Sequence, residues 1–249
     1  MKVISIANQK GGTAKTTTTW NLSACLAEHG KRVLMIDLDP QASLTICQGI
    51  EPGELEISIY NVLSGSVDIN DTIIELGSYD LLPSSIDLSA AEVELSAKIG
   101  KEYLLAKCIR KINKAYDSII IDCPPSLGNL TVNSLCASDY LIIPMACEFL
   151  AYRGLKLLED TIVQVAELNP RLTTLGILPT MYDSRTIHSE EVLREARKGS
   201  IPVFDIVVKK SIKFSDLTIL ARNILDCSPD KFEGKTAYRQ LALEVLNHE

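Results

Sequence analysis

The sequence has few of the residues that build metal centres and disulfide frameworks. It contains three histidines, and its seven cysteines stand singly, without a C-x-x-C pair. Structural zinc sites need closely spaced cysteines and histidines, and disulfide-stapled folds need a dense cysteine framework. Neither class of protein fits this composition. We expect most of the cysteines to be small buried side chains.

Long apolar runs and flexible linkers are missing as well. No stretch approaches the roughly 20 apolar residues that a membrane-spanning helix needs. Lys2 is followed directly by strand-like sequence rather than by the apolar region of a secretory signal. No segment rich in proline, glycine or serine interrupts the 249 residues, of which 46% are hydrophobic. A chain of this length can bury a full α/β core, so we expect a single domain over residues 1–249 and a cytoplasmic protein.

Apolar runs rich in valine, isoleucine and leucine alternate with helical patterns along the chain. The predicted strands are residues 2–7, 32–37, 79–83, 118–122, 140–144, 174–180 and 203–208. The predicted helices are residues 17–29, 88–99, 103–115, 129–137, 150–168, 189–198 and 235–249. Near-continuous apolar strands favour a sheet that is covered on both faces. The predicted fold is therefore α/β, a doubly wound, mostly parallel sheet with helices on both faces and ligands at the carboxyl ends of its strands.

The first predicted strand leads into a glycine turn, residues 8–17, NQKGGTAKTT. A strand, a tight turn and a helix opening at Thr16 would aim backbone N–H groups and the positive helix end at a polyphosphate. In such a loop Lys15 lies on the β and γ phosphate oxygens, and the Thr16 hydroxyl binds Mg²⁺. The usual spacing G-x-x-x-x-G-K-[ST] would place glycine at positions 9 and 14, where this chain has Gln9 and Ala14.

A second lysine makes this pattern more specific. Residues 10–17, KGGTAKTT, resemble the K-G-G-x-G-K-[ST]-T loop of the ParA/MinD family of P-loop NTPases, in which the first lysine reaches the nucleotide of a partner subunit. Ala14 departs from the family pattern. If this position requires a positive φ, alanine costs on the order of 1 kcal/mol, which would reduce nucleotide affinity or turnover. The residues that the resemblance assigns to ATP binding are Lys10, Gly11, Gly12, Thr13, Ala14, Lys15, Thr16 and Thr17.

Two further apolar runs end in carboxylates. Residues 33–43, VLMIDLDPQAS, carry Asp37 and Asp39 at the end of a predicted strand, where unneutralised acids need a cationic partner. The stretch D-x-D-P-Q resembles switch I of the ParA-like ATPases, whose second aspartate orients the attacking water close to Mg²⁺. The resemblance gives this catalytic and metal-adjacent role to Asp39. We interpret Asp37 as a supporting residue near the phosphate loop.

The other run is residues 118–126, SIIIDCPPS, in which Asp122 ends a predicted strand. This arrangement matches a Walker B motif, with Asp122 holding Mg²⁺ directly or through water, opposite Thr16. The stretch D-x-P-P-S resembles switch II of the same family. Nitrogenase iron proteins share this ATPase core and bridge an iron–sulfur cluster through cysteines. The number of cysteines alone does not exclude Cys123 and Cys136 from that role, but Cys123 lies beside Asp122, where the family pattern tolerates small residues.

The resemblance implies a homodimer that sandwiches two ATP molecules. Phosphoryl transfer needs positioning and charge, which Mg²⁺, Lys15, the water at Asp39 and Lys10 acting in trans would supply. Because Lys10 completes the partner's site, nucleotide state and dimer state become coupled. We expect slow hydrolysis of ATP to ADP and phosphate, accelerated by a partner. Residues 177–186, ILPTMYDSRT, resemble the family segment that passes near the base, so Met181 is either a base contact or a packing residue of a loop.

The charge distribution bears on the partner. The net charge of −7 argues against nonspecific binding to DNA or to anionic membranes. Residues 194–239, however, hold ten lysines and arginines against six acidic residues. This stretch is either a solvated basic surface or a DNA-binding one, and ParA partition proteins use basic residues in this region. The candidate DNA contacts, which would bind in a salt-sensitive way, are Lys209, Lys210, Lys213, Arg222 and Arg239.

Three functions remain open at this point. The first is a nucleoid-associated DNA-partition ATPase, whose ATP dimer binds DNA nonspecifically and is released when a ParB-like centromere-binding partner stimulates hydrolysis. The second is a MinD-type membrane-associated ATPase, but the end of residues 235–249 is acidic, unlike the basic amphipathic tail of MinD-type relatives. The third is an ATP-dependent metabolic ligase, similar to dethiobiotin synthetase, which would need a small-molecule pocket and would not need Lys10. We expect the first, with no membrane partner.

Overall fold

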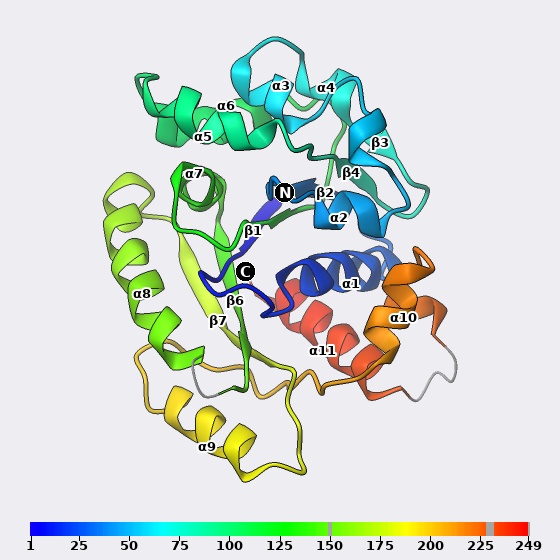
Figure 1. Cartoon of the computed structure of the whole chain (residues 1–249), viewed down its shortest axis with the longest axis vertical. Coiled ribbons are helices and arrows are strands. Elements are labelled where there is room, and N and C mark those ends of the chain that lie inside the picture. Colours follow the sequence, from blue (N-terminus) through cyan, green and yellow to red (C-terminus); the bar gives the residue numbers. More distant parts are fainter. Residues whose placement is uncertain (149–150, 228–231, 249) are drawn as a thin grey trace.

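A seven-stranded sheet forms the centre of the computed structural model, which describes residues 1–148, 151–227 and 232–248 (Figure 1). The strand order is β3-β4-β2-β5-β1-β6-β7, and the pairings are parallel except that β3 runs antiparallel to β4. The strands are β1 (Lys2–Ile6), β2 (Val33–Asp37), β3 (Ile74–Glu75), β4 (Asp80–Leu82), β5 (Ser118–Asp122), β6 (Tyr140–Ala146) and β7 (Thr173–Thr180). The predicted mostly parallel sheet is confirmed.

Helices cover both faces of this sheet (Figure 1). The α-helices are α1 (Lys15–Glu28), α2 (Ser43–Cys47), α3 (Ile59–Ser64), α4 (Ile69–Thr72), α5 (Leu88–Ser96), α6 (Leu104–Ile109), α7 (Asn129–Ala137), α8 (Ala151–Leu168), α9 (Ile187–Ala196), α10 (Lys213–Ile219) and α11 (Glu233–Asn247). Short 3-10 turns occur at η1 (Pro52–Glu54), η2 (Lys101–Tyr103) and η3 (Ile224–Asp226).

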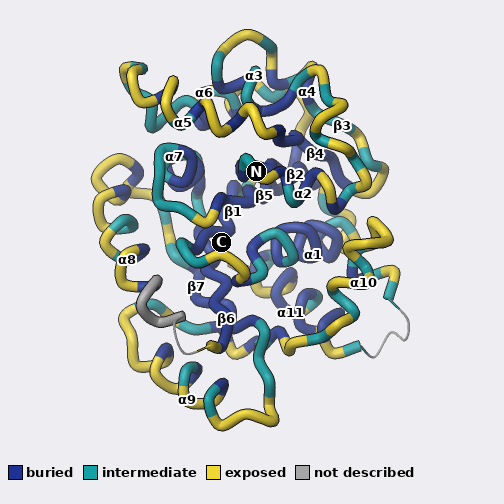
Figure 2. The backbone as a smooth tube through the Cα atoms, viewed as in Figure 1, coloured by how far each residue is buried: buried dark blue, intermediate teal, exposed yellow. Residues whose placement is uncertain are grey.

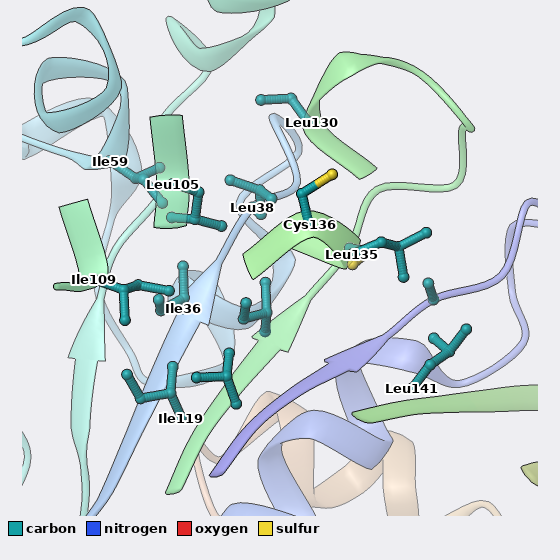
Figure 3. Packing of buried hydrophobic residues seen from close by; sticks show 14 of the residues in the cluster. Ile36, Leu38, Ile59, Leu105, Ile109, Ile119, Leu130, Leu135, Cys136 and Leu141 are labelled. Atoms are coloured by element: carbon teal, nitrogen blue, oxygen red, sulfur yellow. The ribbon is translucent and has the colours of Figure 1, made fainter. Parts of the chain in front are cut away.

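The core divides into two apolar clusters, one on each face of the sheet. Alternate residues of one strand enter different clusters: Ile119 and Ile121 join one, whereas Ile120 joins the other. In the first cluster Leu105 and Ile109 of α6 pack against the sheet residues Ile36 and Ile119 (Figure 3). The central strands are accordingly buried along their length (Figure 2). This double coverage explains why the strands read as continuous apolar runs rather than as alternating ones.

The last helix packs onto the body of the protein. Tyr238, Leu241 and Ala242 of α11 are fully buried in the second cluster, which also contains Leu22 and Leu26 of α1. The apolar face of this helix is therefore used in the core. In the part of the chain that the structure describes, no helix is long and apolar enough to span a membrane.

Two predicted elements differ in the structure. Residues 203–208 are not a strand: they lie beside β7, with isolated bridges between Ile177 and Val203 and between Tyr182 and Lys209. Pro179 in β7 has no N–H to donate, so a continuous ladder cannot form there. The helix predicted over 103–115 ends at Ile109. Farther along, the backbone N–H of Asn113 donates to the side chain of Asn70 over 2.8 Å instead of continuing a helix. The first residue of the helix predicted over 150–168 lies outside the described residues.

Candidate functional site

The glycine turn lies at the carboxyl end of β1, the strand between β5 and β6. Gly12 and Ala14 both adopt the left-handed conformation, with φ of 71° and 67°. The positive φ at position 14, on which the cost of alanine depended, is thus confirmed. Ala14 precedes α1 directly and provides no side-chain hydrogen bond to cap it. The first N–H groups of α1 point out of the helix end and favour an anion there.

Lys15 opens α1 from a largely buried position, with 7% of its surface exposed. Its Nζ donates to the carbonyl oxygen of Lys10 over 3.3 Å, so the amine bends back across the turn. Burial lowers the pKa of Lys15, and the nearby charges of Asp122 and Asp39 act in the opposite direction. A cation with few protein partners inside a glycine turn is the arrangement that receives a phosphate group.

Asp122 and Thr16 meet beneath this turn. The Thr16 hydroxyl donates to Oδ2 of Asp122 over 2.6 Å, and Asp122 has no exposed surface. Asp122 is also the register partner of Asp37 on the neighbouring strand. Burial first, and then the charge of Asp37, raise the pKa of Asp122 well above its usual range. A carboxylate that remains charged here therefore needs a cation.

The oxygen donors at this position fit Mg²⁺. Mg²⁺ prefers hard oxygen ligands and is usually held by one or two carboxylates together with phosphate oxygens and water. Within residues 1–148, 151–227 and 232–248, no group of three or more histidine, cysteine, aspartate or glutamate side chains could hold a metal by itself. A divalent ion at Thr16 and Asp122 would therefore depend on the oxygens of a bound phosphate.

Asp37 supports the site without facing a ligand. It is fully buried and accepts three hydrogen bonds: from the backbone N–H of Asp39 over 3.2 Å, and from the backbone N–H and hydroxyl of Thr45 over 2.8 and 2.7 Å. Burial raises the pKa of Asp37 to about 7. These contacts hold the start of α2 against the end of β2, in agreement with the supporting role that the sequence suggested.

Asp39 lies between Asp37 and α2, with 8% of its surface exposed. Its Oδ1 accepts the backbone N–H of Gln41 over 2.9 Å, and burial raises its pKa. Its carbonyl oxygen accepts the hydroxyl of Ser84 over 2.7 Å. The structure thus gathers Lys15, Asp39 and Asp122 in one electrostatic cluster, as the sequence predicted. Sequence reasoning missed Thr45 and Ser84, since their contacts join separate stretches of the chain.

Lys10 points away from this cluster. Its Nζ forms an ion pair with Oε2 of Glu148 over 3.2 Å, and the two side chains are 30% and 57% exposed. Glu148 follows the carboxyl end of β6. Sequence reasoning did not single out Glu148, although an acidic residue directly after a buried strand is the same signal that identified Asp37 and Asp122.

A pocket of about 210 Å³ opens beside the turn. Met181, with a φ of 50°, lines this pocket together with Ala14 and Thr17, which places the proposed base contact next to the phosphate loop. The rest of the wall was largely not predicted, because most of it comes from residues 208–218, at and after the end of the wrongly predicted strand, whereas Tyr238 belongs to α11. That wall consists of Val208, Lys209, Lys210, Ser211, Phe214, Ser215, Thr218 and Tyr238.

The predicted DNA contacts are arranged in two groups. Lys209 pairs with Glu233 over 3.0 Å, and Lys213 lies 4.8 Å over the ring of Phe232, next to the exposed Lys210. Arg222 follows α10 and is also exposed. Arg239 lies apart from these on α11, where its Nε donates to Glu28 of α1 over 2.8 Å. Arg239 therefore helps to hold α11 against α1.

Five of the seven cysteines are buried, whereas Cys108 and Cys227 are partly exposed. The thiol of Cys123 is fully buried and donates to the hydroxyl of Ser134 over 3.1 Å, and Cys136 is 7% exposed. Burial raises the pKa of Cys123 to about 12 and that of Cys136 to about 11. Thiolates are the ligands of iron–sulfur clusters, so these protonated core thiols argue against a cluster shared between subunits.

Comparisons with known proteins agree with this geometry. A family model described as an AAA domain matches residues 1–174. The chain is 41% identical to the sporulation initiation inhibitor protein Soj of Bacillus subtilis, over 98% of each protein. It is 39% identical to the chromosome partitioning protein ParA of Caulobacter vibrioides, over 100% of this chain and 95% of that protein.

A similar protein of known structure carries a different name from these two relatives. The chain is similar to cobyrinic acid a,c-diamide synthase from Mycobacterium smegmatis, with 41% identity and a TM-score of 0.89, over 100% of this chain and 95% of that one. That protein has been solved with ADP and magnesium, and with an ATP analogue and magnesium.

Proposed function

Because the chain belongs to the ParA and Soj family of P-loop ATPases, we propose that it is an ATP-driven partition protein. In this proposal the protein binds ATP and Mg²⁺, and two copies pair around two nucleotides. The dimer binds DNA without regard to sequence, on the nucleoid in the cytoplasm. A ParB-like partner then stimulates slow ATP hydrolysis and releases the dimer from DNA.

The position of Lys10 is the observation that carries this proposal. Lys15, Thr16 and Asp122 already supply the contacts that a triphosphate and Mg²⁺ need within one subunit. Lys10 stands beside them with its amine directed to Glu148 at the surface. A second lysine at this position has a role if its amine contacts the phosphates of the nucleotide that the other subunit binds.

The surface around the site supports pairing. Ile86 follows β4 and is 64% exposed, and Ile187 opens α9 after β7 and is 79% exposed. Both strands belong to the parallel part of the sheet, so both side chains follow carboxyl ends, as the phosphate loop does. In the proposed dimer, a second copy would cover these two side chains.

The cations on residues 209–222 support the DNA contact. Lys209 and Lys210 lie in the wall of the pocket beside the phosphate loop, while Lys213 begins α10. Arg239 lies apart from this group on α11, so we propose a lesser part for it. Pairing of two subunits would double the positive surface, and contacts of this kind neutralise DNA phosphates and release counterions.

A DNA-retention assay tests the proposal. The protein is passed over immobilised duplex DNA of unrelated sequence with ATP, with ADP or without nucleotide, across a series of salt concentrations. The proposal predicts retention that requires ATP and that falls steeply as salt rises. Absence of retention at low salt with ATP would reject it.

The name of the similar mycobacterial structure favours one alternative, an ATP-dependent ligase acting on a small molecule. Such an enzyme would turn over ATP only with its acceptor substrate, and its turnover would not require Lys10. ATP hydrolysis that is unaffected by Lys10→Ala and by DNA, but that depends on an added small-molecule acid, would favour this alternative over partition.

A further inference from the structure

Ser84 connects the exit of β4 to the segment that contains Asp39. It is fully buried. Its hydroxyl donates to the carbonyl oxygen of Asp39 over 2.7 Å. Its backbone N–H donates to the hydroxyl of Thr45 over 3.0 Å, and that hydroxyl in turn donates to Asp37. One residue from another part of the chain therefore contacts both ends of the segment 39–45.

The segment needs such an external contact. Its own hydrogen bonds are local: the N–H of Gln41 reaches the side chain of Asp39, and the N–H of Ala42 reaches its carbonyl oxygen over 2.8 Å. Ala42 also has a φ of 51°, a conformation that is unfavourable for alanine. A strained residue of this kind persists when the surrounding structure fixes it. Ser84 supplies that constraint at Asp39, through the hydrogen bond to its carbonyl oxygen.

We propose that Ser84 is a positioning residue for ATP hydrolysis and acts through Asp39. This inference rests on the proposed function, in which the Asp39 carboxylate orients the attacking water. The carbonyl group that accepts the Ser84 hydrogen bond and the carboxylate that would orient the water both belong to Asp39. A shift of the Asp39 backbone would therefore also displace the carboxylate and the water. A small displacement of a positioning group lowers the rate of reaction much more than it lowers substrate binding.

The adjacent residue offers a matched control. Ser85 is 6% exposed, but its hydroxyl pairs with that of Ser58 over 3.0 Å rather than with the segment 39–45. Ser84→Ala should lower kcat for ATP hydrolysis by about tenfold and change KM for ATP by less than about twofold. Ser85→Ala should leave kcat near that of the wild type, and Ser84→Thr, which retains the hydroxyl, should recover most of the activity.

The wild type and Asp39→Ala are measured first, so that the two proposals can fail separately. An Asp39→Ala variant that hydrolyses ATP as fast as the wild type would reject the assignment of Asp39, and with it the role of Ser84. If Asp39→Ala is inactive, equal kcat values for Ser84→Ala and the wild type would reject the role of Ser84 alone. Equal losses in Ser84→Ala and Ser85→Ala, with matching losses of thermal stability, would also reject it. A loss confined to Ser84→Ala, with ATP binding retained, would support it.

Discussion

The amine of Lys10 lies 3.2 Å from Oε2 of Glu148 within the same subunit. An amine in this ion pair is not available to a nucleotide on another subunit, so pairing of two subunits must compete with the contact. Both side chains are partly exposed, and ion pairs of this type contribute at most about 1 kcal/mol. Glu148 thus restrains Lys10 weakly.

Glu148→Gln should release this restraint. We expect the ATP-dependent dimer to form at a protein concentration up to about thirtyfold lower, because each of the two subunits gives up one exposed ion pair worth at most about 1 kcal/mol. Sedimentation over a range of protein concentrations measures the change. Lys198→Gln, which removes a different exposed ion pair, that with Glu195, is the control and should leave dimerisation unchanged.

Ala14→Gly should stabilise the protein. Alanine with a φ of 67° is strained, and glycine relieves that strain by about 1 kcal/mol, less the entropy that glycine adds to the unfolded chain. Urea unfolding measures the effect. The matched control is Ala24→Gly in the interior of α1, which should destabilise the protein by about 1 kcal/mol. Destabilisation by Ala14→Gly would contradict the strain at this position.

Lys15→Ala should abolish nucleotide binding while leaving the fold intact. Lys15 is largely buried, and its hydrogen bond to Lys10 joins two residues of the same loop. Removing its amine should therefore reduce phosphate binding more than it reduces the stability of the fold. Isothermal titration with ADP and Mg²⁺ checks this. Lys31→Ala, which removes a partly exposed lysine just before β2, is the control and should bind ADP normally. Unchanged ADP affinity in Lys15→Ala would reject the assignment of the loop.

Phe214→Ala should weaken binding of the base. Phe214 lines the pocket beside Ala14, and its ring lies edge-on to Tyr238 at 6.0 Å. Loss of an aromatic wall should raise the Kd for ADP by about tenfold. The affinity for inorganic tripolyphosphate, which has no base, should change little. If both ligands lose affinity equally, the pocket does not hold the base.

The pair of Glu28 and Arg239 should make stability depend on pH. The hydrogen bond from Arg239 lowers the pKa of Glu28 below its ordinary value of 4.5. A carboxylate with a lowered pKa contributes its stability above the ordinary value and loses it as the pH falls through the lowered one. The difference in urea stability between the wild type and Arg239→Gln should therefore be greatest above about pH 5 and shrink toward pH 3. A difference that is constant with pH would contradict this account.

The chemistry of the site could be read from the sequence where a buried strand ends in a charged or glycine-rich turn. Lys15, Asp39 and Asp122 follow strands that are neighbours in the sheet, so local patterns and parallel topology suffice to bring them together. The positive φ at Ala14 could also be anticipated, because the glycine of the family pattern marks it.

The remaining contacts depend on tertiary structure that local patterns do not encode. Ser84 reaches Asp39 across 45 residues, and Glu148 reaches Lys10 across 138 residues. The part of the pocket wall that residues 208–218 form also depends on tertiary structure, and the sequence did not predict it. Residues 203–208 have the composition of a strand, but Pro179 in the facing strand interrupts the ladder, and the segment bends toward the phosphate loop instead.

The most direct test of the account is the mass of the protein in solution with Mg²⁺ and either ATP or ADP, measured by sedimentation on the Asp39→Ala variant so that ATP persists. With ATP the mass should double from the 27.3 kDa of one chain, and with ADP it should not. Adding Lys10→Ala should keep the protein monomeric with ATP, while its affinity for ADP stays unchanged. A monomer under every condition, or a dimer that forms equally well without Lys10, would contradict the claim that Lys10 completes the site of a second subunit.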